Sequence, residues 1–360
     1  MPMSNGGRDA GLDTVAIDTV AAVLAADYRL SPTELRRLPI GQGTVNYRAC
    51  GARRNVFVKC YPTHADLAAE RDAIGLSGLA GRHGVPVAAV VPTIAGEPIS
   101  SHGPRAISVW EWVEGHTVTD PLTTAQQLAA GAALGRIHRA FAPLPASSGP
   151  APQVASWRSV DLATLSATID RLQAVITERK TSGQRDEFDA IAEQTLMQRG
   201  TMLRHIPALL AELPELTAQV LHGDYSPVNI LFDGEELTAV IDFRPPDSFL
   251  IAYDLGRMAF YPNTVVRDKA WRTAAATLIT GYLQTNPTVA ATDIRACARV
   301  ALLQLLGSLY GVKQHYLKPG LFQDDLDDFW LLRHHTAQAL LDHLPDTDDL
   351  LADLLTAAHR

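Results

Sequence analysis

Residues 220–243 read VLHGDYSPVNILFDGEELTAVIDF, and this stretch decides the fold. Short apolar runs alternate with polar segments, and an Asp-Gly pair separates two of the runs, which is typical of a β-hairpin. Asp224 and Asn229 stand five residues apart in a loop, and Asp242 follows an apolar, β-branched run. We therefore expect a small strand-rich island that presents three polar side chains at its loops.

The three side chains suit one chemistry. Carboxylate and amide oxygens such as those of Asn229 and Asp242 are hard ligands for Mg²⁺, which commonly takes only one or two carboxylates and completes its shell with water and phosphate. A further carboxylate in the same loop, here Asp224, can orient a hydroxyl group and accept its proton. Any one of these residues alone is equally typical of a turn. Their combination favours a metal-assisted reaction at a hydroxyl group.

A glycine-rich run lies upstream, Gly41-Gln42-Gly43-Thr44-Val45-Asn46. A dinucleotide-binding fold would require a helix next, but the following residues are few and end at Gly51, which indicates the second arm of a hairpin. Glycines at a hairpin tip allow backbone N–H groups to approach phosphates. An ordinary hairpin turn is the alternative interpretation.

Lysine is scarce in this chain. Of 31 basic residues only five are lysine, yet Lys59 stands inside the strand-like run of residues 56–61. An ammonium group that is partly buried in a strand is costly unless it is paired. Glu70, on the helix expected over residues 64–80, is an available partner. The alternative is a surface lysine whose aliphatic stem packs on the protein.

The order of these elements is that of kinases: glycine-rich hairpin, strand lysine, helix glutamate, loop aspartate, then two metal ligands. The motifs are H-G-D-x-x-x-x-N from His222 and I-D-F around Asp242, joined by Leu134-Gly135-x-x-His138 and Tyr253-Asp254-Leu255. They resemble the aminoglycoside phosphotransferase and choline kinase-like family. The resemblance implies an α+β, bilobal, protein-kinase-like fold with a small antiparallel-sheet N-lobe and a larger, mainly helical C-lobe. We expect the lobes over residues 13–110 and 111–360.

The resemblance also implies residue roles. Asp224 would be the base, or orienting group, for the acceptor hydroxyl, and Asn229 and Asp242 would hold Mg²⁺. Lys59 would contact the α- and β-phosphates with Glu70 as its partner. Further nucleotide contacts would come from Gly41, Gly43, Asn46 and the main chain near Glu111 and Val113, while His222 and Asp254 would brace the catalytic loop.

The implied activity is transfer of the γ-phosphoryl group of ATP, with GTP as an open alternative, to a hydroxyl of a small molecule. We expect an antibiotic or related natural product, of the aminoglycoside, peptide or nucleoside type. A homoserine- or choline-type metabolite is the alternative, followed by a catalytically silent nucleotide-binding scaffold. Two positions depart from the family pattern. Asn46 replaces a third glycine, and Arg244 follows the metal aspartate, which argues against a strongly anionic acceptor site.

Composition sets the remaining limits. The 360 residues carry a formal charge of −8, which argues against binding nucleic acid by bulk charge. Three scattered cysteines form no disulfide framework or zinc motif, and they are interpreted as reduced thiols. Residues 1–12 are polar and glycine-rich, as in a disordered tail, and no apolar run reaches the ~20 residues of a membrane span. We therefore expect a cytoplasmic enzyme, without a membrane partner and of open oligomeric state.

Overall fold

The computed structural model describes residues 17–40, 43–52, 54–101, 105–145, 152–318 and 323–358; the tail expected over residues 1–12 lies outside these ranges. The chain divides into two units. The first holds the described residues up to Gly115 together with Thr238–Pro246, and the second holds His116–Leu237 and the residues from Asp247 onward. The sequence did not indicate that residues 238–246 belong with the first unit. Val240 joins that unit by donating its N–H to the carbonyl of Pro86 at 2.8 Å.

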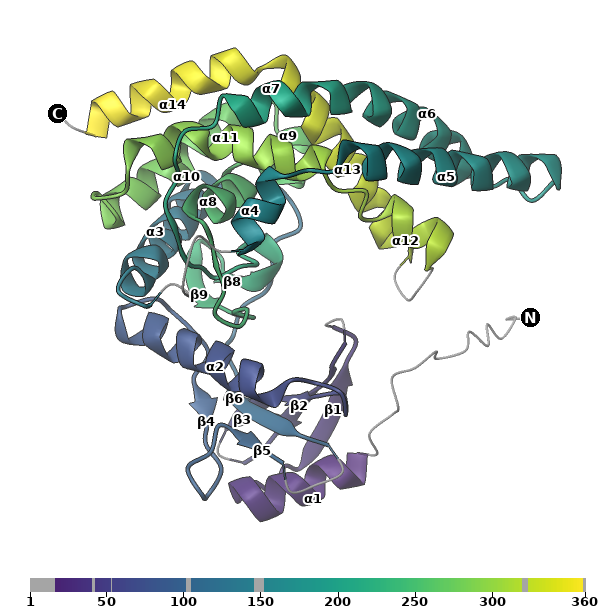
Figure 1. Cartoon of the computed structure of the whole chain (residues 1–360). Coiled ribbons are helices and arrows are strands. Elements are labelled where there is room, and N and C mark those ends of the chain that lie inside the picture. The colour runs from purple at the N-terminus through teal and green to yellow at the C-terminus, as the bar shows by residue number, and fades with distance from the viewer. Residues whose placement is uncertain are drawn as a thin grey trace. The chain divides into compact units, whose positions relative to one another are not determined.

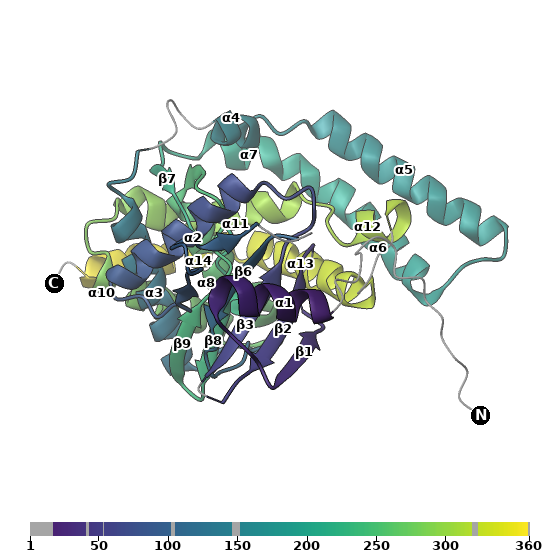
Figure 2. The same ribbon diagram turned by 90° about the horizontal axis from the view of Figure 1, so that it is seen from below.

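The first unit is a β-sheet with a helix on each face (Figures 1 and 2). Its elements are α1 (Ile17–Tyr28), β1 (Glu34–Leu38), β2 (Val45–Cys50), β3 (Asn55–Cys60), α2 (Leu67–Arg82), β4 (Val90–Val91), β5 (Ile99–Ser100) and β6 (Ile107–Glu111). The strand order is β1-β2-β3-β6-β4, with β5 also paired to β6, and every pair is antiparallel.

Strand β3 shows how the sequence builds this sheet. Its residues alternate in burial, because successive side chains of a strand point to opposite faces. Val56, Val58 and Cys60 pack in the core beneath α1. Lys59 is directed to the other face, where α2 lies. The strand expected over residues 85–93 is mostly wrong, because only Val90–Val91 is a strand; the prolines before and after it cannot donate to a ladder.

The second unit is mainly helical. Its helices are α3 (Thr124–Phe141), α4 (Pro152–Arg158), α5 (Leu162–Thr181), α6 (Glu187–Met202), η1 (Leu203–His205), α7 (Ile206–Ala211), η2 (Pro227–Asn229), α8 (Ile251–Ala259), α9 (Pro262–Arg267), α10 (Trp271–Thr285), α11 (Ala291–Leu306), α12 (Val312–Leu317), α13 (Gln323–Asp342) and α14 (Leu344–Ala358). Two short strand pairs interrupt them: β7 (Ala218–Val220) with β10 (Ser248–Leu250), and β8 (Ile230–Asp233) with β9 (Glu236–Val240), whose residues from Thr238 onward are counted with the first unit. The expected hairpin is confirmed, with Gly234 at its turn at φ +58°.

Helices α3 and α10 pack with their backbones in close approach. A Cβ placed on Gly131 of α3 would lie 1.9 Å from the carbonyl oxygen of Leu278, and one on Gly281 of α10 would lie 2.3 Å from that of Leu128. No side chain fits at such distances, because the contact is with backbone that cannot move aside. The glycines therefore set the spacing between these two helices.

Replacing Gly131 by alanine is expected to lower the free energy of unfolding by about 3 kcal/mol, because the added methyl group overpacks this contact. Chemical denaturation of the purified protein measures it. Gly200→Ala is the matched control: Gly200 is exposed in α6 and nothing lies within 4 Å of the added atom. That variant should gain roughly 0.5–1 kcal/mol from helix propensity. Equal effects at both positions would contradict the packing argument.

Candidate functional site

Lys59 is held by two carboxylates in the first unit. Its Nζ lies 3.2 Å from Oδ1 of Asp242 and 3.8 Å from Oε2 of Glu70, which stands in the first turn of α2. The lysine side chain is 21% exposed. It also lies 5.5 Å from the ring centroid of Tyr61. One partly buried ammonium thus has two acidic partners, which direct it at a defined point.

Asp242 has a strained backbone. Its φ is +59°, in the left-handed region that L-residues with side chains seldom adopt, although Asp tolerates it better than most. The residue follows β9 and its side chain is 50% exposed. Residues kept in such conformations cluster at functional sites, where the surrounding structure imposes the geometry. The carboxylate is therefore presented by a constrained segment rather than by a free loop.

The glycine-rich turn is seen in part. Gly41 and Gln42 lie outside the described residues. Gly43 has φ +85°, and no atom of the described residues beyond its chain neighbours lies within 4 Å of a Cβ placed on it, so its backbone is open to an approaching group. Asn46 is buried and is used inside the turn: its Nδ2 donates to the carbonyl of Ile40 at 2.8 Å, and its Oδ1 accepts from Thr44 Oγ1 at 3.3 Å.

Glu111 and Val113 differ in what their main chain offers. The N–H of Glu111 donates to the carbonyl of Ala89 at 2.8 Å, and its side chain faces Arg54 at 3.8 Å. The N–H of Val113 makes no hydrogen bond to any residue within the described ranges. Of the two main-chain donors, that of Val113 is therefore the one available to a ligand.

Asp224 and Asn229 lie together in the second unit. The Nδ2 of Asn229 donates to the main-chain carbonyl of Asp224 at 2.9 Å and to its Oδ2 at 3.2 Å. These two donations fix which end of the amide is nitrogen. The Oδ1 of Asn229 accepts no hydrogen bond from the described part of the chain. The loop therefore presents one amide oxygen and one carboxylate as hard ligands or acceptors.

Two buried residues brace this loop. The N–H of Asp224 donates to Nδ1 of His222 at 3.2 Å, and the N–H of Gly223 donates to Oδ2 of Asp254 at 3.2 Å. Gly223 has φ +81°, a conformation that favours glycine. Both His222 and Asp254 are fully buried. Backbone donors of the loop thus end on side chains that cannot move freely, and the position of the Asp224 carboxylate follows from them.

Asp254 is ionised although it is buried. Burial opposes its charge, but the facing imidazole of His138, whose Nε2 is 3.6 Å away, the charge of His222 and the N–H of Gly223 together lower the pKa of the Asp254 carboxyl. His138 is in turn fixed by Tyr282, whose hydroxyl is 2.9 Å from its Nδ1. A group whose pKa is lowered on folding stabilises the fold above its ordinary pKa and loses that contribution as pH falls through the folded value.

Asp254→Asn is therefore expected to lower the free energy of unfolding at neutral pH by about 3 kcal/mol, since it leaves buried partners without their counter-charge. The difference in free energy of unfolding between wild type and variant should stay constant from pH 8 to pH 5. It should narrow below about pH 4, where the carboxyl of the unfolded wild-type chain begins to bind a proton while that of the folded chain, with its lower pKa, is still ionised. Urea unfolding across this range measures both curves, and a gap that widens in acid would contradict the assignment.

Sequence reasoning missed Arg257. This residue stands three positions after Asp254 on α8, and its Nη2 forms an ion pair with Oδ1 of Asp224. Its Nη1 donates to the hydroxyl of Tyr253 at 3.2 Å. Together with Asn229, it occupies both oxygens of the Asp224 carboxylate. The available signal was the spacing in Y-D-L-G-R, which places the arginine one helical turn beyond a motif residue.

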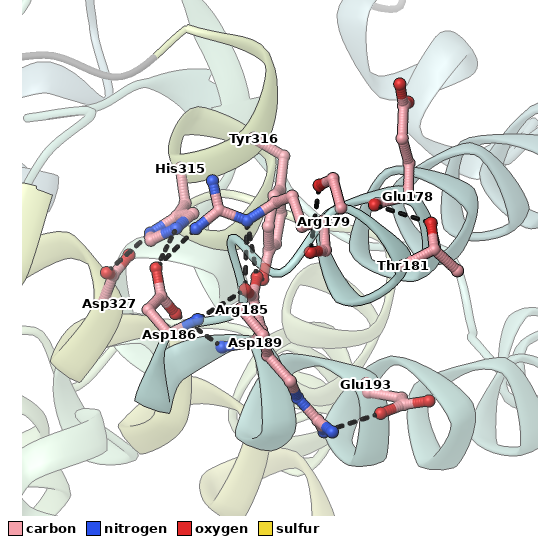
Figure 3. Close-up of polar contacts among 11 residues, drawn as sticks. Glu178, Arg179, Thr181, Arg185, Asp186, Asp189, Glu193, His315, Tyr316 and Asp327 are labelled. Atoms are coloured by element: carbon pink, nitrogen blue, oxygen red, sulfur yellow. Dashed lines mark hydrogen bonds and ion pairs between the residues drawn. The ribbon is translucent and has the colours of Figure 1, made fainter.

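A second acidic cluster lies at the ends of α5, α6 and α12 (Figure 3). Asp186, Asp189 and His315 place one potential ligand atom each within 4.8 Å of one another. Arg179 already supplies a cation: its Nε bonds both oxygens of Asp189 at 3.0–3.1 Å and its Nη2 bonds Asp186 at 2.7 Å. The hydroxyl of Tyr316 donates to Asp189 at 2.8 Å. These contacts assign the cluster a structural role in joining helices.

Comparison with known proteins decides the family. Residues 34–293, well over half of the chain, match the phosphotransferase enzyme family. The chain belongs to this family. The family resemblance expected from the H-G-D and I-D-F motifs is confirmed, and so is the fold class.

Within the family, the chain is 29% identical over 182 residues to homoserine kinases of Nitrobacter hamburgensis and Nitrobacter winogradskyi. That match covers 51% of this chain and 49% of each relative, so it spans about half the length of these curated proteins.

Solved structures of family-like kinases share the fold. An amicoumacin kinase in complex with AMP-PNP, Ca²⁺ and Ami superposes with a TM-score of 0.61 at 14% identity, covering 90% of this chain and 94% of that one. A spectinomycin phosphotransferase in complex with ADP and spectinomycin gives 0.61 at 14% identity, with 91% and 99% covered. A microcompartment-associated aminopropanol kinase gives 0.56 at 16% identity, with 92% and 98% covered. Every described helix falls short of the length or the apolar character that a bilayer crossing requires.

Proposed function

We propose that this protein is an ATP-dependent kinase that transfers the γ-phosphoryl group to a hydroxyl of a small molecule. The observation that carries the proposal is Lys59, whose ammonium lies 3.8 Å from Glu70 and 3.2 Å from Asp242. A strand lysine paired with a helix glutamate, beside the metal-binding aspartate, is the arrangement on which kinases depend for phosphate positioning. Family membership supports the same reaction class.

Asp224 is the group we assign to the acceptor hydroxyl. Phosphoryl transfer demands little covalent chemistry from the protein, so alignment and charge stabilisation dominate. Arg257 and Asn229 each hold one oxygen of the Asp224 carboxylate, which fixes its orientation. Its remaining lone pairs can accept the hydroxyl proton as the oxygen attacks phosphorus. The carboxylate is 30% exposed, so a substrate can reach it.

A divalent cation fits the donor set that we assign to it. Asn229 has an amide oxygen without a partner in the described part of the chain, and Asp242 presents a half-exposed carboxylate. Oxygen donors of this kind, one of them a carboxylate, suit Mg²⁺. When bound, the ion would neutralise charge on the phosphate oxygens of the nucleotide. The Ca²⁺ and nucleotide analogue named with the amicoumacin kinase support the same pairing of ligands.

The acceptor is a small molecule, and two classes have support. An antibiotic or related natural product is suggested by the amicoumacin and spectinomycin kinases that share the fold. A homoserine-type metabolite is the second candidate, because the homoserine kinases are more similar in sequence, at 29% identity. A catalytically silent nucleotide-binding scaffold is the alternative to kinase activity. It is opposed by the presence of Lys59, Asp224, Asn229 and Asp242 together.

An ADP-release assay tests the proposal. The full chain is incubated with Mg²⁺, with ATP or GTP, and with pools of hydroxyl compounds: aminoglycosides, peptide and nucleoside antibiotics, choline and homoserine. We expect at least one pool to raise ADP formation well above the rate with water alone, and removal of Mg²⁺ by chelation to abolish it. Nucleotide binding without acceptor-stimulated ADP release in any pool would favour the scaffold.

A further inference from the structure

Arg257 places a positive charge directly beside Asp224. Its guanidinium pairs with Oδ1 of Asp224 and donates to Tyr253 at 3.2 Å. Burial opposes its charge, but the carboxylate of Asp224, with Tyr253 and Asp254, holds the pKa of Arg257 above its ordinary value. The guanidinium is therefore fixed and charged, and it is 34% exposed. A molecule whose hydroxyl reaches Asp224 must also meet this arginine.

Arg333, on α13, is a second guanidinium that lies within electrostatic range of Arg257 and has no anionic partner in the described part of the chain. It forms no ion pair and no hydrogen bond with any residue that the structure describes, and its Nε is buried without a partner. Its guanidinium carbon lies 5.5 Å from the ring centroid of Phe329. Burial and the positive charge of Arg257 lower the pKa of Arg333 to about 10. The two guanidinium groups thus repel each other, and the Asp224 carboxylate is paired with Arg257.

Two other arginines of this unit donate to defined acceptors. Arg199 is fully buried, but it donates to the carbonyls of Leu305 and Ser308 where α11 ends, which suits a cation at a helix C-terminus. Arg299 pairs with Glu212 and Asp348 at 3.0 and 2.7 Å. Arg333 has no such role. A partly buried guanidinium without a carbonyl or carboxylate is costly in the free protein, and an anionic ligand removes that cost.

We propose that the acceptor is a hydroxy acid, and that Arg333, assisted by Arg257, binds its carboxylate while its hydroxyl meets Asp224. A guanidinium offers paired donors that match a carboxylate. The phenols of Tyr253, Tyr261 and Tyr310 lie within electrostatic range of Arg333. This inference rests on the proposed kinase function and specifies its acceptor. The same two positive charges would repel a molecule of net positive charge, so polycationic aminoglycosides and choline are disfavoured.

The experiment compares acceptors that differ only in charge. The full chain, with ATP and Mg²⁺, is offered a set of short hydroxy acids including L-homoserine and 4-hydroxybutyrate, the matched amides of each, and choline. ADP release gives kcat/KM for each compound. The expected result is that acids are preferred over their amides by at least tenfold. Arg333→Met should lower kcat/KM for the acid on the order of 100-fold and leave that of the amide unchanged.

Controls separate recognition from folding. Arg333→Lys, which keeps the charge, should restore part of the preference, and Arg295→Met, at an exposed arginine of α11, should change nothing. Preference for amides or for choline overturns the inference, as does an Arg333→Met variant that turns over the acid at the wild-type rate. A stability measurement on each variant confirms that it is folded.

Binding distinguishes this inference from the kinase proposal. The same acids and amides are mixed with protein and AMP-PNP, and saturation-transfer NMR reports which of them bind. If acids bind and Arg333→Met abolishes their binding while no compound stimulates ADP release, the kinase proposal fails and the carboxylate site stands. If no acid binds, or the variant binds acids equally, the carboxylate site fails whether or not ADP is released with other acceptors.

Discussion

Asp224→Asn is expected to reduce acceptor-stimulated ADP release by about 10³-fold, because asparagine cannot take the proton that the attacking hydroxyl gives up. The substitution keeps the size of the side chain, and its oxygen can still contact Arg257. Nucleotide binding should persist, since no phosphate contact is assigned to Asp224. Steady-state ADP release and calorimetric titration with AMP-PNP measure the two quantities separately.

The matched control is Asp233→Asn, at an exposed acid in the turn between β8 and β9. That variant should keep wild-type turnover. An Asp224→Asn protein with full activity would contradict the assignment of Asp224 as the base. Loss of nucleotide affinity along with turnover would instead assign Asp224 a role in binding ATP, which contradicts the proposal in a different way.

Lys59→Met should lower kcat/KM for ATP by about 10²–10³-fold. Methionine keeps the apolar stem and removes the charge. The carboxylates of Asp242 and Glu70 then lose their ion-pair partner, and the phosphates of the nucleotide lose the cation that we assign to them. The variant should show weaker affinity for AMP-PNP and slower turnover together. Glu70→Gln should lower affinity and turnover in the same way but less strongly. It removes one of the two ion pairs of Lys59, and the pair with Asp242 at 3.2 Å remains.

Lys180→Met is the control for Lys59, since Lys180 is an exposed lysine near the end of α5. Activity should be unchanged there. A Lys59→Met protein whose affinity for AMP-PNP and whose kcat both match the wild type would show that the ion pairs of Lys59 are only structural. In that outcome a lower free energy of unfolding should be the sole effect.

The sequence indicated those parts of the site that depend on local pattern. Lys59 and Glu70 are eleven residues apart, so a strand followed by a helix was enough to bring them into range. Asp242 is 183 residues from Lys59; motif order assigned both residues to nucleotide and metal binding but did not predict their 3.2 Å contact. The buried role of Asn46 was not foreseen, because its hydrogen bond to Ile40 closes the turn in a way that residue type does not reveal.

The acceptor side could not be predicted for a physical reason. Phosphates are bound by few residue types in a fixed order, whereas Arg257 and Arg333 stand on helices α8 and α13, which no short motif connects. Their proximity depends on how the helices of the second unit pack. The strand expected over residues 85–93 was mostly wrong for a local reason. Pro86 and Pro92 interrupt the apolar run, and only Val90–Val91 forms a strand.

The path of the chain has a practical consequence for engineering. It leaves the first unit after Gly115, returns at Thr238 and leaves again after Pro246. A fragment cut at Gly115 would therefore lack Asp242 and the Val240 bridge to Val87. Residues 247–360, by contrast, carry both arginines assigned to the acceptor and none of Lys59, Asp224, Asn229 or Asp242. A chimera that joins residues 1–246 of one relative to the residues after position 246 of another would thus exchange the two arginines assigned to the acceptor. The phosphate-binding residues of the first relative would stay unchanged.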